Sequence, residues 1–382
     1  MKAMRIVTVV CWVIAALALA GLAIWFLTGT VFGYRSGNWE SPFSGISIGN
    51  FEVLTGPYEE VGTYEVGVED IKSLYIDWVS GNVKVEPYDG NMIKITEYAQ
   101  RKLNDNEKLH MSTSSGVLTI RYIEQNLRQW NMPQKRLEIL VPRGLCQNFE
   151  YVTIDAMSSD ISANDIGATG IKADTSSGSV SLTNIASHTL TVNTMSGTTT
   201  VSSVITDVFD IDATSGSITV RSTQSGEMNI NSMSGTVRIT ESSARSISCD
   251  TTSGSISVAG DFESMDMRSM SGRVDADSTA ATSVVFVETT SGSIGISGSF
   301  DRVDTKSMSG SVNIRSLVVP SSVKVDTTSG SITIAIPDGE TITVNHSSIS
   351  GSFSSDVPVL MQNSGAQFSI STMSGRTRIV II

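Results

Sequence analysis

The stretch DTTSGSISVAGDFESMDMRSMSGRV, Asp250–Val274, contains the dipeptide Ser-Gly twice. Thr252 stands before the first pair and Met270 before the second, and apolar residues alternate with polar ones on both sides of each glycine. Alternation with a period of two is typical of a β-strand. Glycine adopts a positive φ without steric penalty, so it suits a corner. The stretch therefore predicts units of two short strands, with one strand on each side of a Ser-Gly corner.

The same unit recurs through the second half of the chain. The spacing between successive glycines is most often 19 residues, and Ser159 holds the equivalent place before the first of them. Four apolar columns lie seven and five residues before the glycine and two and four residues after it. Repeats of this kind bury their apolar faces against neighbouring repeats, so twelve units predict a β-solenoid. The glycines are Gly178, Gly197, Gly216, Gly235, Gly254, Gly272, Gly292, Gly310, Gly330, Gly351 and Gly375.

Charged residues four positions before the glycine indicate the length of one coil. Acids alternate there with amides and later with bases, in the order Asp174, Asn193, Asp212, Asn231, Asp250, Arg268, Glu288, Lys306, Asp326. A coil of two units would stack the acids about 4.8 Å apart, where each pair repels by about 1 kcal/mol even in water. A coil of one unit places each acid beside an amide or a base. We therefore expect parallel coils of about 19 residues. An antiparallel meander with Ser-Gly hairpins is the alternative.

Methionine alternates with serine or threonine two positions before the glycine. Packing of long side chains beside short ones at the corner is the simpler interpretation of this column. An adaptable binding surface is the other, because methionine is flexible and polarisable.

The N-terminus predicts a membrane anchor. Residues 6–28 carry no charge and, as a helix, are long enough to cross a hydrocarbon core of about 30 Å. A cleaved signal peptide is the alternative, although the apolar run is longer than signals usually have. Lys2 and Arg5 place residues 1–5 in the cytoplasm. We expect a single-pass protein of the cell membrane with its C-terminal domain outside the cytoplasm.

Between the anchor and the repeats the pattern is weaker. Residues 29–70 read as a juxtamembrane linker with one or two strands, 71–150 as an irregular β capping region, and 151–382 as the regular solenoid. Within the cap, LYIDWVSGNVKV around Gly81 and LHMSTSSGVLTI around Gly116 show the same offsets as the repeats. The last unit ends in RTRIVII without a polar cap. This predicts either cover by the loop 354–366 or self-association through the C-terminal coil.

Composition and residue placement argue against several function classes. A net charge of −12 is unfavourable for binding nucleic acid. Three cysteines do not make a disulfide framework, and Cys146 with Cys249 is the one candidate pair. The acids form a ladder rather than a catalytic constellation, and the three histidines His110, His188 and His346 lack metal-ligand spacing. Calcium binding by stacked acids would need the two-unit coil. We therefore predict no catalytic, cofactor-binding or metal-binding residues and no cofactor.

An N-terminal anchor, the strand LEILVP at Leu137–Pro142, and repeated SGSI and MSG units together resemble the bacterial putative-adhesin family of β-strand repeat proteins of unknown function. The resemblance covers Ile71–Ile382. It implies a surface protein, with some relatives tied to envelope-stress signalling, and it implies no functional residue.

The sequence thus predicts an all-β protein: a single-chain parallel β-solenoid behind one transmembrane helix. We expect a membrane-anchored extracytoplasmic structural or interaction module, in adhesion or as an envelope-stress accessory, with an envelope glycan or protein as partner. We do not expect an enzyme. A polysaccharide-active β-helix enzyme is the alternative, because many right-handed β-helices have that activity.

Overall fold

The structure, a computed structural model, describes residues 57–124, 133–338, 341–360 and 365–382. They belong to one compact unit, Leu54–Ile382. Within these residues no helix has the length and apolar content needed to cross a bilayer. The predicted transmembrane segment 6–28 and most of the predicted linker lie outside the described residues.

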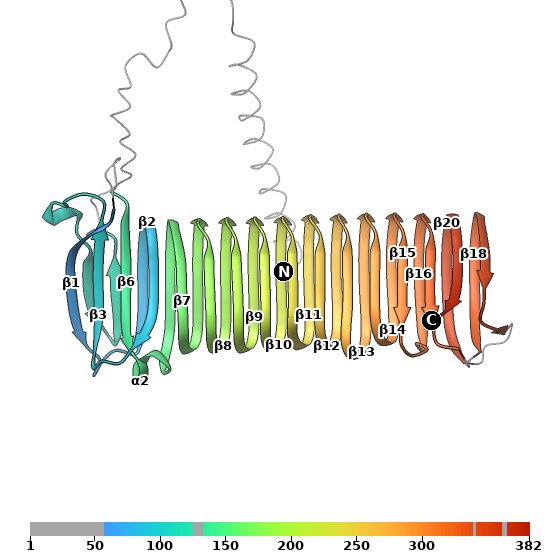
Figure 1. Ribbon diagram of the computed structural model, residues 1–382, viewed down its shortest axis with the longest axis horizontal. Helices are drawn as coiled ribbons and strands as arrows, with labels where there is room; N and C mark the ends of the chain where they lie inside the picture. Colours follow the sequence, from blue (N-terminus) through green and yellow to red (C-terminus); the bar gives the residue numbers. More distant parts are fainter. Residues whose placement is uncertain (1–56, 125–132, 339–340, 361–364) are drawn as a thin grey trace, which may run out of the picture. The chain divides into compact units, whose positions relative to one another are not determined.

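The unit is a rod of stacked coils made almost wholly of strands (Figure 1). Its central strands are β7 (Phe149–Ser177), β8 (Val180–Ser196), β9 (Thr199–Ser215), β10 (Ile218–Ser234), β11 (Val237–Ser253), β12 (Ile256–Ser271), β13 (Val274–Ser291) and β14 (Ile294–Ser309). Neighbours pair in parallel one unit apart: Val180 pairs with Thr199, and Thr199 with Ile218. The prediction of parallel coils of about 19 residues is confirmed, and the meander and the two-unit coil are excluded for this array.

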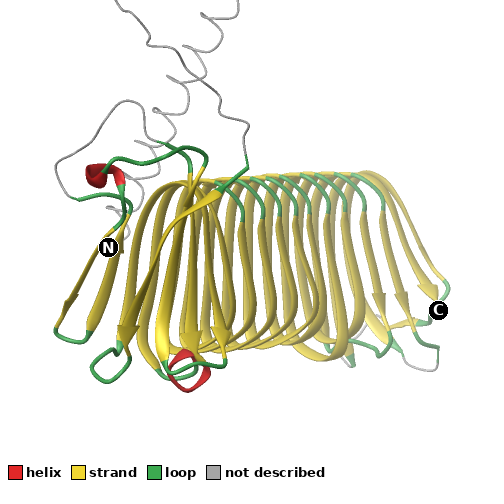
Figure 2. Ribbon diagram, turned by 60° about the vertical axis from the view of Figure 1, so that its left-hand side comes forward, coloured by secondary structure: helices red, strands yellow, loops and turns green. Residues whose placement is uncertain are grey.

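The Ser-Gly pairs between successive central strands form corners, and Figure 2 shows these turns aligned along one edge of the rod. Gly216 has a φ of 119°, and a Cβ added to it would lie 1.9 Å from the carbonyl oxygen of Gly197 in the next coil. Both the backbone angle and the close approach therefore require glycine.

A second corner, which the sequence did not indicate, lies six residues after the Ser-Gly glycine. Non-glycine residues there have φ between 51° and 56° in successive coils. A positive φ is uncommon outside glycine, and short polar side chains tolerate it best. The residues are Asp165, Asn184, Ser203, Ser222 and Glu241.

The core consists of the predicted apolar columns and two more. Val201, Phe209 and Ile211 represent the predicted columns and are fully buried. A further column three residues before the glycine is filled by small residues, such as Thr194 and Ala213. Another, seven residues after the glycine, runs Ile166, Ile185, Val204, Thr223 and Ser242, all buried.

At the C-terminal end the spatial order of the strands differs from their order in the sequence. β14 pairs with β15 (Val312–Ser316) and β16 (Ser322–Ser329), which lead to β17 (Ile332–Ile336), β18 (Ile342–Ser355), β19 (Val359–Leu360) and β20 (Ala366–Ile381). β20 pairs with β16 and β17 on one side and with β18 on the other (Figure 1). Ile370, for example, lies between Val325 and His346.

The last strand is therefore an inner layer, and the premise that the C-terminal coil ends the rod is wrong. The outermost coil is β18, a serine-rich strand with His346 and Ser348 in columns that are apolar or small elsewhere. β20 contributes the buried Phe368, Ile370 and Ile379. Terminal repeats of a solenoid need a polar outer face. Placing the aliphatic strand inside and the polar strand outside supplies one.

At the other end, antiparallel strands close the rod. β2 (Ser73–Tyr88) pairs with β7 in parallel, and Gly81 stands opposite Ser159. β5 (Val117–Arg121) and β6 (Lys135–Pro142) pair with the outer edge of β2 in parallel. β4 (His110–Ser114) pairs with β5, and β3 (Met92–Ala99) pairs with β6, both in antiparallel orientation. β1 (Glu59–Gly67) pairs with β3 and falls within the segment predicted as a linker with one or two strands. The short helices are η1 (Asp105–Glu107) and α2 (Arg143–Cys146).

One expectation for this region is corrected. The Ser-Gly at 115–116 is a hairpin turn, because Ser115 (φ 50°) and Gly116 (φ 80°) both take the positive φ of a two-residue turn between antiparallel β4 and β5. Leu118 therefore pairs with Leu74 instead of occupying a column of its own coil. Cys146 and Cys249 are both free and buried and do not form a disulfide.

Candidate interaction surface

One exposed apolar feature runs along the rod beside the Ser-Gly corners. In spatial order the residues two before the glycine are Met157, Ser176, Met195, Thr214, Met233, Thr252, Met270, Thr290, Met308, Thr328, Met373 and Ile349. Because β20 lies inside β18, methionine alternates with a small residue without a break. We call the six methionines the methionine ladder.

The methionine ladder is solvent-exposed, so the interpretation as corner packing is wrong. The methionine side chains are between 39 % and 60 % exposed, and Ile349 at the end is 80 % exposed. The preceding residue in each coil points inward and is small, as Ser269 beside Met270 illustrates. Successive methionines are two coils, or about 9.6 Å, apart, and the ladder is about 48 Å long.

From Asp174 onward, each acid of the charged column next to the ladder lies beside an amide or a base, as the sequence predicted. At the start of the column the pattern differs, because Asp77 pairs with Asp155, which lies one unit before Asp174. Asn193 Nδ2 donates to Asp174 Oδ1 at 2.7 Å, and Asn231 Nδ2 donates to Asp212 Oδ1 at 2.8 Å. Asp250 stands opposite Arg268 in the next coil. Burial raises the pKa of Asp250 above its usual range, although the Arg268 guanidinium opposes this. The column follows the coil order Asp174, Asn193, Asp212, Asn231, Asp250, Arg268, Glu288, Lys306, Asp326 and Ser371.

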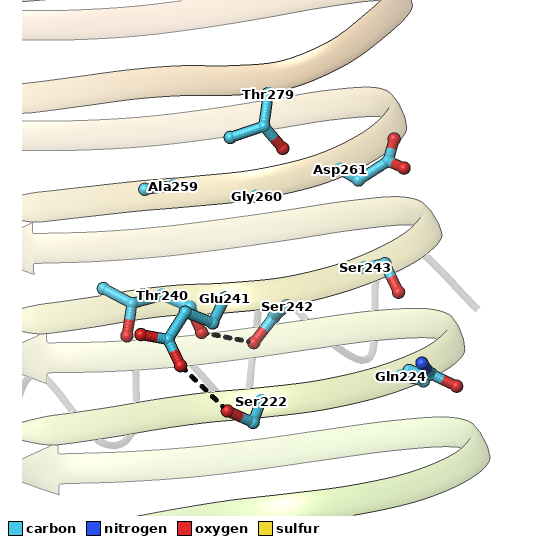
Figure 3. Close-up of a pocket in the computed structure, with 10 residues that line it drawn as sticks. All are labelled: Ser222, Gln224, Thr240, Glu241, Ser242, Ser243, Ala259, Gly260, Asp261 and Thr279. Carbon is cyan, nitrogen blue, oxygen red and sulfur yellow. Dashed lines mark hydrogen bonds between the residues drawn. The ribbon is translucent and has the colours of Figure 1, made fainter.

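A shallow groove of about 530 Å³ lies at the second corner (Figure 3). Five of its ten lining residues bear hydroxyl groups, and the lining includes the carboxylates of Glu241 and Asp261. Ser222 Oγ donates to Glu241 Oε2 at 3.0 Å, and Ser242 Oγ donates to the Thr240 carbonyl at 2.9 Å. The lining therefore offers hydroxyl and carboxylate groups as hydrogen-bond partners for a polar ligand.

A buried ion pair in the N-terminal cap has a structural role. Lys135 Nζ lies 2.7 Å from Glu97 Oε1, and both side chains are fully buried. The ammonium also donates to the carbonyls of Glu107 and Tyr122 and lies 4.0 Å from the Tyr122 ring centroid. Burial lowers the pKa of Lys135, although Glu97 opposes this. Because these groups are fully partnered and closed to solvent, they join β3, β5, β6 and η1 rather than forming a ligand site.

The sequence-noted histidines do not meet. His188 is exposed, with Nδ1 2.5 Å from Asp207 Oδ2, while His346 contacts the Phe353 ring with 5.0 Å between centroids. His110 lies in β4 at the opposite end from β18. In the part of the chain that the structure describes, no group of three or more His, Cys, Asp or Glu side chains could hold a metal ion.

The repeated coil and its closing strands match a known family. The family model described as Toastrack DUF4097 matches residues 71–263 and 261–379, most of the chain. The chain belongs to the Toastrack family. This agrees with the resemblance to proteins of unknown function described as putative adhesins. No curated protein matches this Toastrack chain.

Three solved structures similar to the Toastrack chain are all described as putative adhesins. One from Parabacteroides distasonis is 14 % identical, covers 73 % of this chain and 97 % of its own, and has a TM-score of 0.40. One from Bacteroides fragilis is 10 % identical, covers 84 % of this chain and 96 % of its own, and has a TM-score of 0.34. One from Parabacteroides merdae is 11 % identical, covers 71 % of this chain and 94 % of its own, and has a TM-score of 0.28. At these low TM-scores the likenesses carry no argument about function.

Proposed function

We propose that this Toastrack chain is a membrane-anchored, extracytoplasmic interaction module of the cell surface. The observation that carries the proposal is the methionine ladder, a regular row of half-exposed apolar side chains along a rigid rod. Contiguous exposed apolar surface marks sites of interaction in soluble domains. Methionine adapts its shape to varied partners.

The anchor in this proposal is the uncharged segment 6–28. Lys2 and Arg5 on its N-terminal side favour a cytoplasmic N-terminus and an external rod. The family resemblance supports a role in adhesion or as an accessory in the envelope-stress response for a rod in that position. In either role the rod would present its exposed face to an envelope glycan or protein.

We favour binding over catalysis because the acids beside the ladder are engaged in coil-to-coil contacts. Asp174 and Asp212 each accept a hydrogen bond from an asparagine of the neighbouring coil. A polysaccharide-active enzyme would instead need two carboxylates placed to act on one glycosidic bond. The groove with Glu241 and Asp261 is where such activity would be sought.

The proposal is tested by measuring how tightly the full chain in nanodiscs binds purified envelope glycans and envelope membrane vesicles. The ladder variant Met195→Ser/Met233→Ser/Met270→Ser/Met308→Ser should bind at least tenfold more weakly than wild type. Leu317→Ser/Val318→Ser is the matched control, since these exposed apolar residues lie off the ladder, and it should bind normally. Equal binding by both variants would contradict the role of the ladder, and release of glycan fragments would favour the enzyme.

Topology is tested separately in whole cells. Thr200 is exposed on the face after the corner, so Thr200→Cys in a Cys11→Ser background should react with a membrane-impermeant maleimide in intact cells. Labelling only after lysis would overturn the extracytoplasmic assignment.

A further inference from the structure

We propose that the methionine ladder binds the methionine ladder of a second copy of this chain, with the two rods antiparallel and each methionine opposite a small residue. The inference names the partner of the interaction module proposed above and rests on that function. It follows from the order of side chains along two adjacent columns.

The first column sets the alignment of the two rods. Numbered in space, the coils run from coil 1, with Met157, to coil 12, with Ile349, and methionine occupies the odd coils. A twofold axis parallel to the strands reverses the second rod and brings each column onto itself. When coil k faces coil 13 − k, every odd coil faces an even one. Long side chains then face Ser or Thr throughout, except at the two ends, where Met157 faces Ile349.

The charged column selects the same alignment independently. With coil k facing coil 13 − k, Asp250 faces Arg268, and Asp212 faces Lys306. Glu288, Asp326 and Asp174 then face Asn231, Asn193 and Ser371, so no acid meets an acid in this column. Shifting the second rod by one coil brings methionine onto methionine and acid onto acid, such as Asp212 onto Glu288. A parallel pair would place every side chain opposite its own copy.

One column further from the corner, the same alignment brings Asp210 opposite Asp304. This is a like-charge contact at the margin of the surface, where water screens it. Asp210 already accepts a hydrogen bond from Asn229 Nδ2 at 2.9 Å. The complementary contacts lie closer to the ladder.

The surface is large enough for a stable pair. A typical stable interface buries about 800 Å² on each partner. A ladder about 48 Å long reaches this area with a strip about 17 Å wide, the length of five strand residues. The outward columns from six to two residues before the glycine supply that width. Since the coils are hydrogen-bonded to each other along the rod, little order is lost on pairing.

The antiparallel arrangement also places the two β1 ends at opposite ends of the pair. This geometry suits contact between molecules on two facing surfaces. The pairing would therefore serve homophilic adhesion, in which copies of this chain on two surfaces bind each other.

Single cysteines on the full chain in nanodiscs, in a Cys11→Ser background, test the pairing by oxidative cross-linking. Met270→Cys should cross-link to itself, because coil 7 of one rod faces coil 6 of the other. Met157→Cys is the matched control on the same ladder with similar exposure. It should not cross-link to itself, since the two copies would be about 53 Å apart. A mixture of Met157→Cys and Ile349→Cys should give the mixed dimer.

Charge reversal tests the second column. Arg268→Asp should weaken the dimer at least tenfold in sedimentation equilibrium, because it would face Asp250. Asp250→Arg/Arg268→Asp should restore the dimer, whereas Arg238→Asp on the other face should leave it unchanged.

Self-cross-linking of Met157→Cys as efficient as that of Met270→Cys would overturn the antiparallel arrangement. A wild-type chain that stays monomeric would overturn the pairing. If that monomer still loses envelope binding in the ladder variant, the proposed function stands and the occupant of the ladder is envelope material.

Discussion

Asn193 donates a hydrogen bond from Nδ2 to Oδ1 of Asp174 across 2.7 Å, and the two residues are 19 positions apart in the sequence. The contact joins adjacent coils on the outer face. It explains why amides and acids alternate in this column from Asp174 to Asp250. One 19-residue period of the sequence therefore corresponds to one coil of the rod.

Asn193→Asp should destabilise the rod, because it joins the carboxylates of residues 155, 174, 193 and 212 into one uninterrupted row with a spacing of about 4.8 Å. We expect the free energy of unfolding at pH 7 and low salt to fall by about 1 kcal/mol or more, with partial recovery in high salt. Urea unfolding at two salt concentrations measures this. Asn193→Ser removes the hydrogen bond without adding charge and should show no such salt dependence. Identical salt responses of the two variants would contradict the stacking of these columns.

Gly216→Ala should disrupt the corner. The substitution adds a Cβ 1.9 Å from the Gly197 carbonyl oxygen at a backbone φ of 119°. We expect a loss of at least 3 kcal/mol in unfolding free energy, because neither the angle nor the space can accommodate alanine. Gly144→Ala is the control, since nothing lies within 4 Å of its added Cβ, and it should be near neutral. Thermal and urea unfolding of both variants give the comparison, and equal stability would show that the corner can open.

The sequence was sufficient to predict the parallel coil of about 19 residues. Regular offsets around Gly178 to Gly330 and the charge column identified parallel coils, because periodic burial and like-charge repulsion act locally between neighbouring units. The second corner was missed since its residues, such as Asn184 and Ser203, share a backbone angle rather than a residue type. The exposure of the methionine ladder was missed because period-two alternation is ambiguous at a corner, where Ser269 and Met270 exchange the roles expected from hydrophobicity.

Both ends of the rod required tertiary information. β20 lies inside β18 because Phe368 and Ile370 need cover that the serine-rich coil can give. The lengthened spacings around Gly351 signalled irregularity but not this exchange of order. At the other end, Ser115 and Gly116 look like every other Ser-Gly pair. In the structure β5 pairs with the first part of β2 and β6 pairs with the second part. β4 therefore pairs with β5 instead, and the Ser-Gly between β4 and β5 becomes a hairpin turn.

The two described cysteines should be unreactive in the folded protein. Burial raises the pKa of Cys146 to about 12 and that of Cys249 further, and the Cys146 Sγ lies 3.2 Å from the Asp165 carbonyl oxygen. Only the thiolate attacks disulfide reagents. In a Cys11→Ser variant we expect negligible reaction with Ellman's reagent at pH 8 and two equivalents after denaturation. Rapid native labelling of either thiol would contradict the burial of that coil.

Glu107 in the N-terminal cap should make the cap sensitive to acid. Arg101 donates to its two carboxylate oxygens at 2.7 and 2.9 Å, and the Asn104 N–H donates at 2.8 Å. These bonds, the Arg101 pair above all, lower its pKa from 4.5 to about 2 although burial opposes the shift. Because the folded state holds the proton less tightly than the unfolded chain, this contribution is complete above pH 4.5 and is lost as the pH falls through 2.

Glu107→Gln should therefore be less stable than wild type by roughly 2 kcal/mol at pH 6, and the difference should shrink towards zero by pH 2. The value is below the full conversion of the shift, since Arg101 is one-third exposed and solvent screens the pair. Urea unfolding monitored by Trp78 fluorescence, in a background in which the other four tryptophans are replaced by phenylalanine, measures the difference at this end of the rod across that range. Asp105→Asn is the control on the same turn, because its ion pair with Lys108 is almost fully exposed at the carboxylate. A difference between wild type and Glu107→Gln that persists unchanged at pH 2 would show that packing rather than charge stabilises the turn.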